Sequence, residues 1–386
     1  MGHNGDFCAA LMTSPFTHLG SLPVAEFLAD YWQKKPLLIR QALPGFICPL
    51  APEEIAGLAL EEEVESRLVI ETPKPAGPLH SEWHLEHGPL PDERFATLPP
   101  SHWTVLVQAV DQIFPQVQTL LNQFRFIPNW RLDDVMVSYA SQGGGVGPHF
   151  DYYDVFLLQG QGTRLWRVGE RVDESTPLRD DTDMKILQSF TTSDEWVLEP
   201  GDLLYLPPNV AHWGIAQSDD CVTFSVGFRA PSDSEMLLGF SQFVAEELSA
   251  DQRFSDPDLS LQEDPGEIKP WVLARFKQHL QALMDNEAQL TEWVGRFATE
   301  VKRQSPPSAD LLEGLRLSPA CRAAYVVQEE GVMLFVNGEM ATCSQALAKA
   351  ICSYEPIDMG QYGAEDQELI GQMLEAGWLN DSADHA

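Results

Sequence analysis

The sequence is poor in basic residues. It contains 24 Lys and Arg against 58 Asp and Glu, which gives a formal net charge of −34. Nucleic acids and anionic membrane surfaces are bound through basic footprints. We therefore expect no direct nucleic-acid partner and no membrane partner. The same charge would attract a basic protein or a cationic ligand.

Cysteine clusters and long apolar runs are also missing. The six cysteines form no C-x-x-C pair and show none of the close spacings of zinc fingers or ribbons, so we expect reduced thiols. The beginning, "MGHNGDFCAALMTSPFTHLG", has no positive segment followed by a long apolar one, and no run of 18 apolar residues occurs. These absences predict a cytoplasmic protein.

Several catalytic signatures are absent as well. The chain has no G-x-S-x-G, no Walker loop, no G-x-G-x-x-G after a strand and no family-type pairing of a cysteine with a histidine. Hydrolase and dehydrogenase functions therefore lack support.

The patterning that is present divides the chain into four parts. Short apolar runs with prolines over residues 1–100 predict N-terminal elements that pack on a barrel. Residues 101–231 hold short β-like runs between Gly, Pro and Asp turns, which is typical of a barrel or sandwich. Residues 232–304 predict a helical region, and residues 305–386 predict a small winged-helix-like domain.

Local signals set these boundaries. Ser232-x-x-Glu235 is a capping-box pattern that opens the helical region. "RQSPPSAD" reads as a linker, and the Asn-Gly pair in "GVMLFVNGEM" predicts a β-hairpin in the last part. The amphipathic helices expected after Pro270 are compatible with a core within the chain or with a dimer interface.

The stretch "GGGVGPHFDYYDVFLLQG" combines a glycine run with a His-x-Asp pair. If it is a strand, His149, Asp151 and Tyr153 share one face. A single H-x-D pair is equally compatible with a structural hydrogen bond. However, "EPGDLLYLPPNVAHWG" supplies His212, 61 residues after Asp151. Two histidines and one carboxylate form the facial triad of non-haem Fe(II) oxygenases, whereas zinc more often takes further His or Cys ligands.

Two neighbouring strands carry further polar residues. Arg164, in "QGTRLWRV", needs an anionic partner if it faces inward, and a bound carboxylate would supply one. The alternative is a cation at an exposed strand edge, and by alternation Arg167 is the residue that faces solvent. In "RLDDVMVSYA", Asp134, Met136 and Ser138 lie on one face. We expect no metal at His80, His84 and His87, which lie in a Pro- and Gly-flanked stretch without a partner motif.

The stretches "DDVMVSYASQGGGVGPHFDYYDVFLLQGQGTRLWRVG" and "PGDLLYLPPNVAHWG" resemble the JmjC-type 2-oxoglutarate-dependent oxygenases. The resemblance is closer to the bacterial ribosomal oxygenases that hydroxylate an arginine of large-subunit ribosomal protein L16. It implies an α+β chain with a double-stranded β-helix, the JmjC/cupin jelly-roll barrel, then a helical region and a winged-helix-like domain. It also implies Fe(II), with 2-oxoglutarate and O2 as co-substrates.

The resemblance assigns roles to individual residues. His149, Asp151 and His212 would be the catalytic iron ligands. The family's 2-oxoglutarate carboxylate partners fall on Ser138 and Arg164. Its arginine pocket falls on the three residues Asp134, Met136 and Tyr153.

On this interpretation the substrate is an arginine of L16, and we expect a homodimer. Three alternatives stay open. The chain could be a JmjC hydroxylase of a His, Lys or Asn side chain, or a cupin-like binding module with a vestigial metal site. A DNA-binding regulator would need basic recognition residues that "ALAKAICSYEPIDMGQYGAEDQELIGQM" largely lacks.

Overall fold

The computed structural model describes residues 14–75, 77–301, 314–329 and 331–380. Two compact units result: one contains the described residues up to Ala230 together with residues 314–320, and the other contains Pro231–Val301 and Cys321–Leu379. Cys8 and the expected linker "RQSPPSAD" lie outside the described residues. Within the described part of the chain, no helix is long and apolar enough to cross a membrane.

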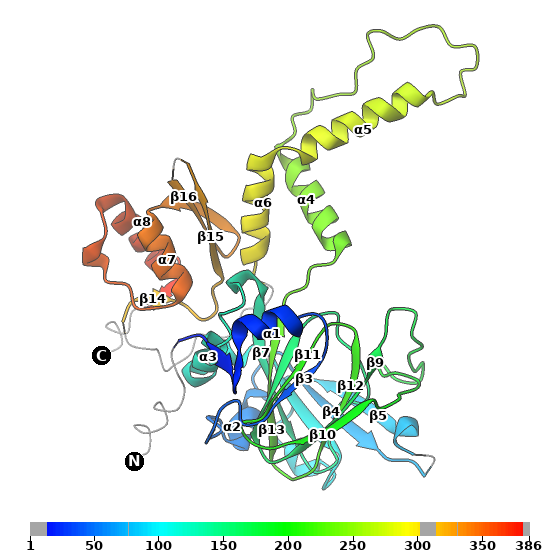
Figure 1. The fold of residues 1–386 in the computed structure, drawn as a ribbon, viewed down its shortest axis with the longest axis vertical. Helices are drawn as coiled ribbons and strands as arrows, with labels where there is room; N and C mark the ends of the chain where they lie inside the picture. The colour runs from blue at the N-terminus through cyan, green and yellow to red at the C-terminus, as the bar shows by residue number, and fades with distance from the viewer. Residues whose placement is uncertain (1–13, 76, 302–313, 330, 381–386) are drawn as a thin grey trace. The chain divides into compact units, whose positions relative to one another are not determined.

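The first unit is mainly β-structure (Figure 1). Its strands are β1 His18–Leu19, β2 Leu22–Pro23, β3 Leu37–Ile39, β4 Ser66–Thr72, β5 Glu82–His87, β6 Trp103–Val107, β7 Leu132–Ala140, β8 Val155–Gln161, β9 Arg164–Arg171, β10 Asp194–Leu198, β11 Leu203–Leu206, β12 Val210–Ala216 and β13 Cys221–Phe228. Its helices are α1 Val24–Asp30, α2 Pro52–Leu58 and α3 Pro115–Asn122, with 3₁₀ turns at Pro78–His80, Phe95–Thr97, Val110–Gln112 and Asn129–Arg131.

These strands form two principal sheets. The larger has eight strands in the order β3-β11-β8-β13-β7-β6-β4-β5, and the smaller has three in the order β10-β9-β12. The pairs in both are antiparallel. Side chains from both sheets line one cavity, so the sheets enclose it between them.

A second apolar layer packs on the other face of the large sheet. Phe156 of β8 lies 5.0 Å from Phe124 and from Tyr205 and 5.4 Å from Phe27, measured between ring centroids. All four rings are fully buried. Strand β8 therefore has core on one face and the cavity on the other, which is why its residues 155–158 are all apolar.

The turn "EPGD" fixes the start of β11. The Asp202 carboxylate is buried and accepts hydrogen bonds from the backbone N–H groups of Gln41 (2.8 Å) and Glu199 (3.1 Å). It also accepts one from Arg40 Nη1 at 2.6 Å. Burial alone would raise the pKa of Asp202, but these donors outweigh it and lower the pKa below its usual value.

The second unit holds helices and a small sheet. Its elements are α4 Asp233–Glu247, α5 Pro270–Met284, α6 Glu287–Thr299, β15 Ala323–Gln328, β16 Gly331–Val336, β17 Glu339–Cys343, α7 Gln345–Ser353 and α8 Ala364–Glu375, with a 3₁₀ turn at Met359–Gln361. Two further strands, β14 Arg316–Leu317, which belongs to the first unit, and β18 Leu379–Asn380, are two residues each.

Two local predictions are confirmed in this unit. Ser232 caps α4, because its Oγ accepts from Glu235 N at 3.2 Å and its own N–H donates to the Glu235 carboxylate at 2.8 Å. Asn337 and Gly338, both with positive φ, form the tight turn between β16 and β17.

Candidate metal and co-substrate site

A glycine-rich loop between β7 and β8 carries the H-x-D pair. Gly143 and Gly147 have φ of +78° and +77°, values that favour glycine. A Cβ on Gly145 would lie 2.4 Å from the carbonyl oxygen of Gly214, so only glycine lets the loop approach β12 this closely. The glycines therefore place this loop against a strand of the small sheet.

The loop joins β12 at the two histidines. His149 N–H donates to His212 O at 3.0 Å, and His212 N–H donates to His149 O at 2.8 Å. Our expectation that His149, Asp151 and Tyr153 lie within a strand was wrong, because β8 begins only at Val155. His149 forms an isolated bridge instead, and this bridge orients the residues that follow it.

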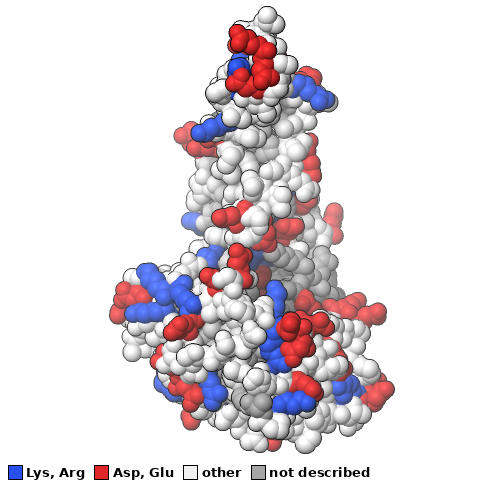
Figure 2. All heavy atoms as spheres, turned by 90° about the vertical axis from the view of Figure 1, so that its right-hand side faces the viewer, with Lys and Arg blue, Asp and Glu red and all other residues white. Residues whose placement is uncertain are grey.

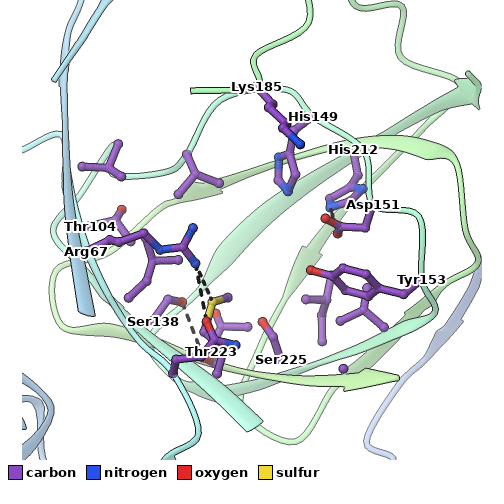
Figure 3. Close-up of a pocket in the computed structure, with 18 of the residues that line it drawn as sticks. Arg67, Thr104, Ser138, His149, Asp151, Tyr153, Lys185, His212, Thr223 and Ser225 are labelled. Carbon is purple, nitrogen blue, oxygen red and sulfur yellow. Dashed lines mark hydrogen bonds and ion pairs between the residues drawn. The ribbon is translucent and has the colours of Figure 1, made fainter. Parts of the chain in front are cut away.

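His149, Asp151 and His212 come together at this bridge. Each offers one ligand atom, and these atoms all lie within 4.8 Å of one another. His212 Nε2 is 3.6 Å from Asp151 Oδ2, and the two imidazole centroids are 4.3 Å apart. Figure 3 shows the three side chains grouped at one end of the cavity.

Hydrogen bonds decide which imidazole nitrogen faces the cavity. His149 Nδ1 is 3.0 Å from Gly147 O, and His212 Nδ1 is 2.9 Å from Val210 O. A carbonyl oxygen only accepts, so both Nδ1 atoms carry a proton, and a neutral imidazole in this arrangement presents the lone pair of Nε2. This arrangement is typical of metal-ligating histidines.

The surroundings of His212 favour its neutral form. Burial and the neighbouring His149 lower the pKa of His212 to about 4, although Asp151 and the bond to Val210 act in the opposite direction. His212 is thus neutral at neutral pH, as a ligand to a metal must be. Two imidazoles and one carboxylate fit Fe(II) by donor type and number.

No other cluster of three or more such ligands occurs among the described residues. In the stretch with His80, His84 and His87, His84 Nε2 lies 3.0 Å from Glu86 Oε1, and Arg94 binds the same carboxylate through two nitrogens. These contacts engage His84 and Glu86 with partners of the protein itself.

The triad opens into a cavity of about 550 Å³. This volume is within the range of small-molecule sites. The lining comes from both sheets and includes all eight residues that the sequence singled out: Asp134, Met136, Ser138, His149, Asp151, Tyr153, Arg164 and His212. The structure thus brings every predicted site residue to one cavity.

Arg164 is a buried cation on the cavity wall. Its residue is 4 % exposed, Nη2 lies 3.5 Å from Ser138 Oγ, and Nε has no hydrogen-bond partner. No carboxylate within the described residues forms an ion pair with it. The buried hydroxyl of Thr104, on the same cavity wall, also lacks a partner. A carboxylate ligand would satisfy these groups, so the cavity fits an anionic co-substrate.

Arg167, by contrast, points outward. Its Nε donates to Glu195 Oε2 of β10 at 2.8 Å, and both side chains are partly exposed. The alternation within β9 therefore separates the two arginines as expected.

The predicted substrate residues form another part of the wall. Asp134 is 6 % exposed, and its Oδ2 accepts from Gln108 Nε2 at 2.9 Å and from Ala109 N–H at 3.1 Å. The hydroxyl of Tyr153 points into the cavity (Figure 3). Desolvation raises the pKa of Tyr153, and the charges of Asp151 and Asp134 raise it further.

Sequence reasoning missed several polar residues of the cavity, among them Arg67, Thr104 and Gln108. Thr104 and Gln108 alternate with apolar residues in "TVLVQ", and Arg67 is a single arginine in the apolar run "SRLVIET". These signals were present, but nothing local indicated that these strands join the cavity wall.

The chain matches two domain families and several known proteins. The JmjC domain model matches residues 119–236, and the ROXA-like winged-helix model matches residues 282–383. The ribosomal protein uL16 3-hydroxylase of Escherichia coli is 36% identical over 285 residues, which cover 73% of this chain and 74% of that protein. A probable ribosomal oxygenase of Haemophilus influenzae is 41% identical over 265 residues, covering 68% of this chain and 61% of that protein.

Solved structures support the same family assignment. The E. coli ribosomal oxygenase YcfD, in complex with cobalt and 2-oxoglutarate, superposes with a TM-score of 0.80 at 30% identity. The match covers 94% of this chain and 99% of that one. The predicted JmjC/cupin barrel and winged-helix domain are confirmed. The chain therefore belongs to the ribosomal oxygenases, a JmjC-domain family of 2-oxoglutarate-dependent oxygenases.

Proposed function

We propose that this protein is an Fe(II)- and 2-oxoglutarate-dependent hydroxylase of an arginine side chain in the large-subunit ribosomal protein uL16, also called L16. One observation carries the proposal. Two histidines and a carboxylate share a cavity with a buried arginine that forms no ion pair with a carboxylate among the described residues. The similarity to the uL16 3-hydroxylase of E. coli supports uL16 as the substrate.

The three ligands His149, Asp151 and His212 would hold the iron. Bound Fe(II), with 2-oxoglutarate and O2, supplies the oxidising power that hydroxylates an unactivated carbon. Arg164 and Ser138 would bind the distal carboxylate of 2-oxoglutarate and thereby orient it. No residue has to act as a general base, so the task of the chain is to position the two substrates.

The substrate arginine would enter beside Asp134, Met136 and Tyr153. Met136 and Tyr153 offer a soft wall and an aromatic ring for the side-chain stem, and Asp134 contributes negative charge. The net charge of −34 would attract a basic ribosomal protein over a long range. We propose that the reaction takes place in the cytoplasm.

The deciding experiment incubates purified uL16 with the protein, Fe(II), 2-oxoglutarate and O2. We expect a mass increase of about 16 Da, the mass of one oxygen atom, on one arginine located by fragmentation. Replacing that arginine by lysine should remove most of the product, because lysine lacks the planar fork of the guanidinium. A shift on His, Lys or Asn alone would make the protein a hydroxylase of that side chain. No shift on any ribosomal protein would favour the binding-module alternative.

We further propose that the protein is a homodimer. On α5, Leu273, Phe276, Leu280 and Met284 follow helical spacing and are each more than half exposed. Figure 2 shows uncharged side chains over much of the drawn helical surface. A second copy of the chain would cover this stripe. We assign one role to each part of the chain. Residues 101–231 would catalyse the reaction, residues 232–304 would form the dimer interface, and residues 305–386 form the winged-helix-like domain.

A further inference from the structure

Arg67 of β4 lies on the cavity face of the large sheet. In the strand register, Arg67 is opposite Leu106 of β6, Leu106 is opposite Ser138 of β7, and Ser138 is opposite Thr223 of β13. Residues directly opposite one another in adjacent strands point to the same face. Arg67 therefore shares the face of Ser138, and Figure 3 shows its guanidinium extended into the cavity.

The contacts of this guanidinium are loose. Arg67 Nη2 lies 3.5 Å from Gln108 Oε1 and 3.9 Å from Met136 Sδ. Both distances are at the long end for hydrogen bonds. Within the part of the chain that the structure describes, no carboxylate oxygen forms an ion pair with Arg67. The side chain is thus held weakly beside Met136, one of the residues proposed to receive the substrate arginine.

Gln108 is held much more firmly than Arg67. Its Nε2 donates to Asp134 Oδ2 at 2.9 Å, and the same oxygen accepts from Ala109 N–H. Because a carboxylate only accepts, the amide nitrogen must face Asp134 and the amide oxygen must face Arg67. Asp134 thus fixes Gln108 so that its carbonyl oxygen, together with the sulfur of Met136, forms a cradle for a guanidinium.

We propose that this cradle is the recognition site for the substrate guanidinium, with Gln108 Oε1 as its acceptor, and that Arg67 occupies it until the substrate displaces it. The inference rests on the proposed arginine hydroxylation and deepens it. Asp134 is then a positioning residue that acts through Gln108. Two guanidinium groups in contact repel each other, so Arg67 has to leave when a substrate arginine enters.

The test compares wild type with Arg67→Ala, Arg67→Met and Gln108→Leu. Two quantities are measured: KM and kcat with uL16, and the Kd of the metal-free protein for a fluorescent uL16 peptide that contains the target arginine. We expect both Arg67 variants to lower KM and Kd by about 2- to 5-fold, the scale of a partly exposed charge contact. We expect Gln108→Leu to raise both by about tenfold or more, because a guanidinium loses a charge-assisted hydrogen bond. Arg167→Met, on the outer face of β9, is the matched control and should change neither.

The outcomes separate the two proposals. Unchanged or higher KM and Kd in both Arg67 variants, with wild-type melting temperatures, would overturn the displacement. An unchanged Kd in Gln108→Leu would overturn its role as acceptor. A failure of the proposed function would give a different result: the wild-type enzyme would add no oxygen to arginine. The peptide Kd still reports on the cradle in that case.

Discussion

His149 and His212 exchange both of their backbone hydrogen bonds, at 3.0 and 2.8 Å, although they come from a loop and from a strand of the small sheet. This reciprocal pairing holds the two imidazole centroids 4.3 Å apart, with His212 Nε2 at 3.6 Å from Asp151 Oδ2. The metal-binding geometry therefore depends on this backbone pairing. Substitution of the ligand side chains leaves the backbone pairing in place.

Asp151→Ala and His212→Ala should each abolish Fe(II) binding and turnover while the fold survives. The backbone bridge remains in both variants, and the apolar core lies on the opposite face of the large sheet. Metal content after desalting, succinate production and the circular dichroism spectrum check this. Substantial turnover by metal-free Asp151→Ala protein would refute the triad.

Arg164→Ala should weaken 2-oxoglutarate binding by about 2–4 kcal/mol, the scale for losing one partner of a buried charged hydrogen-bonded pair, and leave metal affinity nearly intact. Within the described residues the side chain forms no ion pair with a carboxylate, so its loss should not destabilise the fold. Calorimetric titration with 2-oxoglutarate in the presence of Mn(II) measures the effect. Arg167→Ala is the control on the same strand, and equal losses in both variants would contradict the assignment.

Asp202→Ala should lower the free energy of unfolding by about 2–3 kcal/mol at pH 7, because the carboxylate satisfies two backbone donors and Arg40. The folded state lowers the pKa of Asp202 below its usual 3.8. Its stabilisation is therefore complete above that value and is lost as pH falls through the lower folded pKa. The difference between wild type and variant should thus shrink in acid.

Urea unfolding of the Asp202 variant at pH 7 and at successively lower pH values provides the measurement. Asp180→Ala, at an exposed position, is the control and should have little effect at any pH. A difference between wild type and Asp202→Ala that stays constant down to the lowest pH would exclude the ionised carboxylate as its source.

The double substitution Leu273→Asp with Leu280→Asp should convert a dimer to a monomer. Both side chains are exposed on α5, at 63% and 60%, and a charge there could not be buried against a second copy. Light scattering coupled to size exclusion reads the mass. Gln278→Asp, on the opposite side of the helix, should leave the mass unchanged, and a wild-type protein of monomer mass would end the dimer proposal.

Much of the site follows from the sequence alone. Alternation along a strand placed Asp134, Met136 and Ser138 on one face and separated Arg164 from Arg167, because successive side chains in any strand point to opposite sides. The H-x-D pair with a later histidine indicated the metal chemistry, because few sites combine these donors. Such inferences need only the local geometry of the chain.

The tertiary structure determined which strands line the cavity, which local geometry cannot predict. Nothing near Arg67, Thr104 or Gln108 in the sequence shows that β4 and β6 extend the sheet beside β7, because strand pairing and register depend on contacts between distant segments. The same applies to the loop before β8: its alternation predicted a strand, but contact with β12 made it a bridge at His149. The donor types of this site were therefore determined by the sequence, and the neighbours of each donor by how the two sheets close around the cavity.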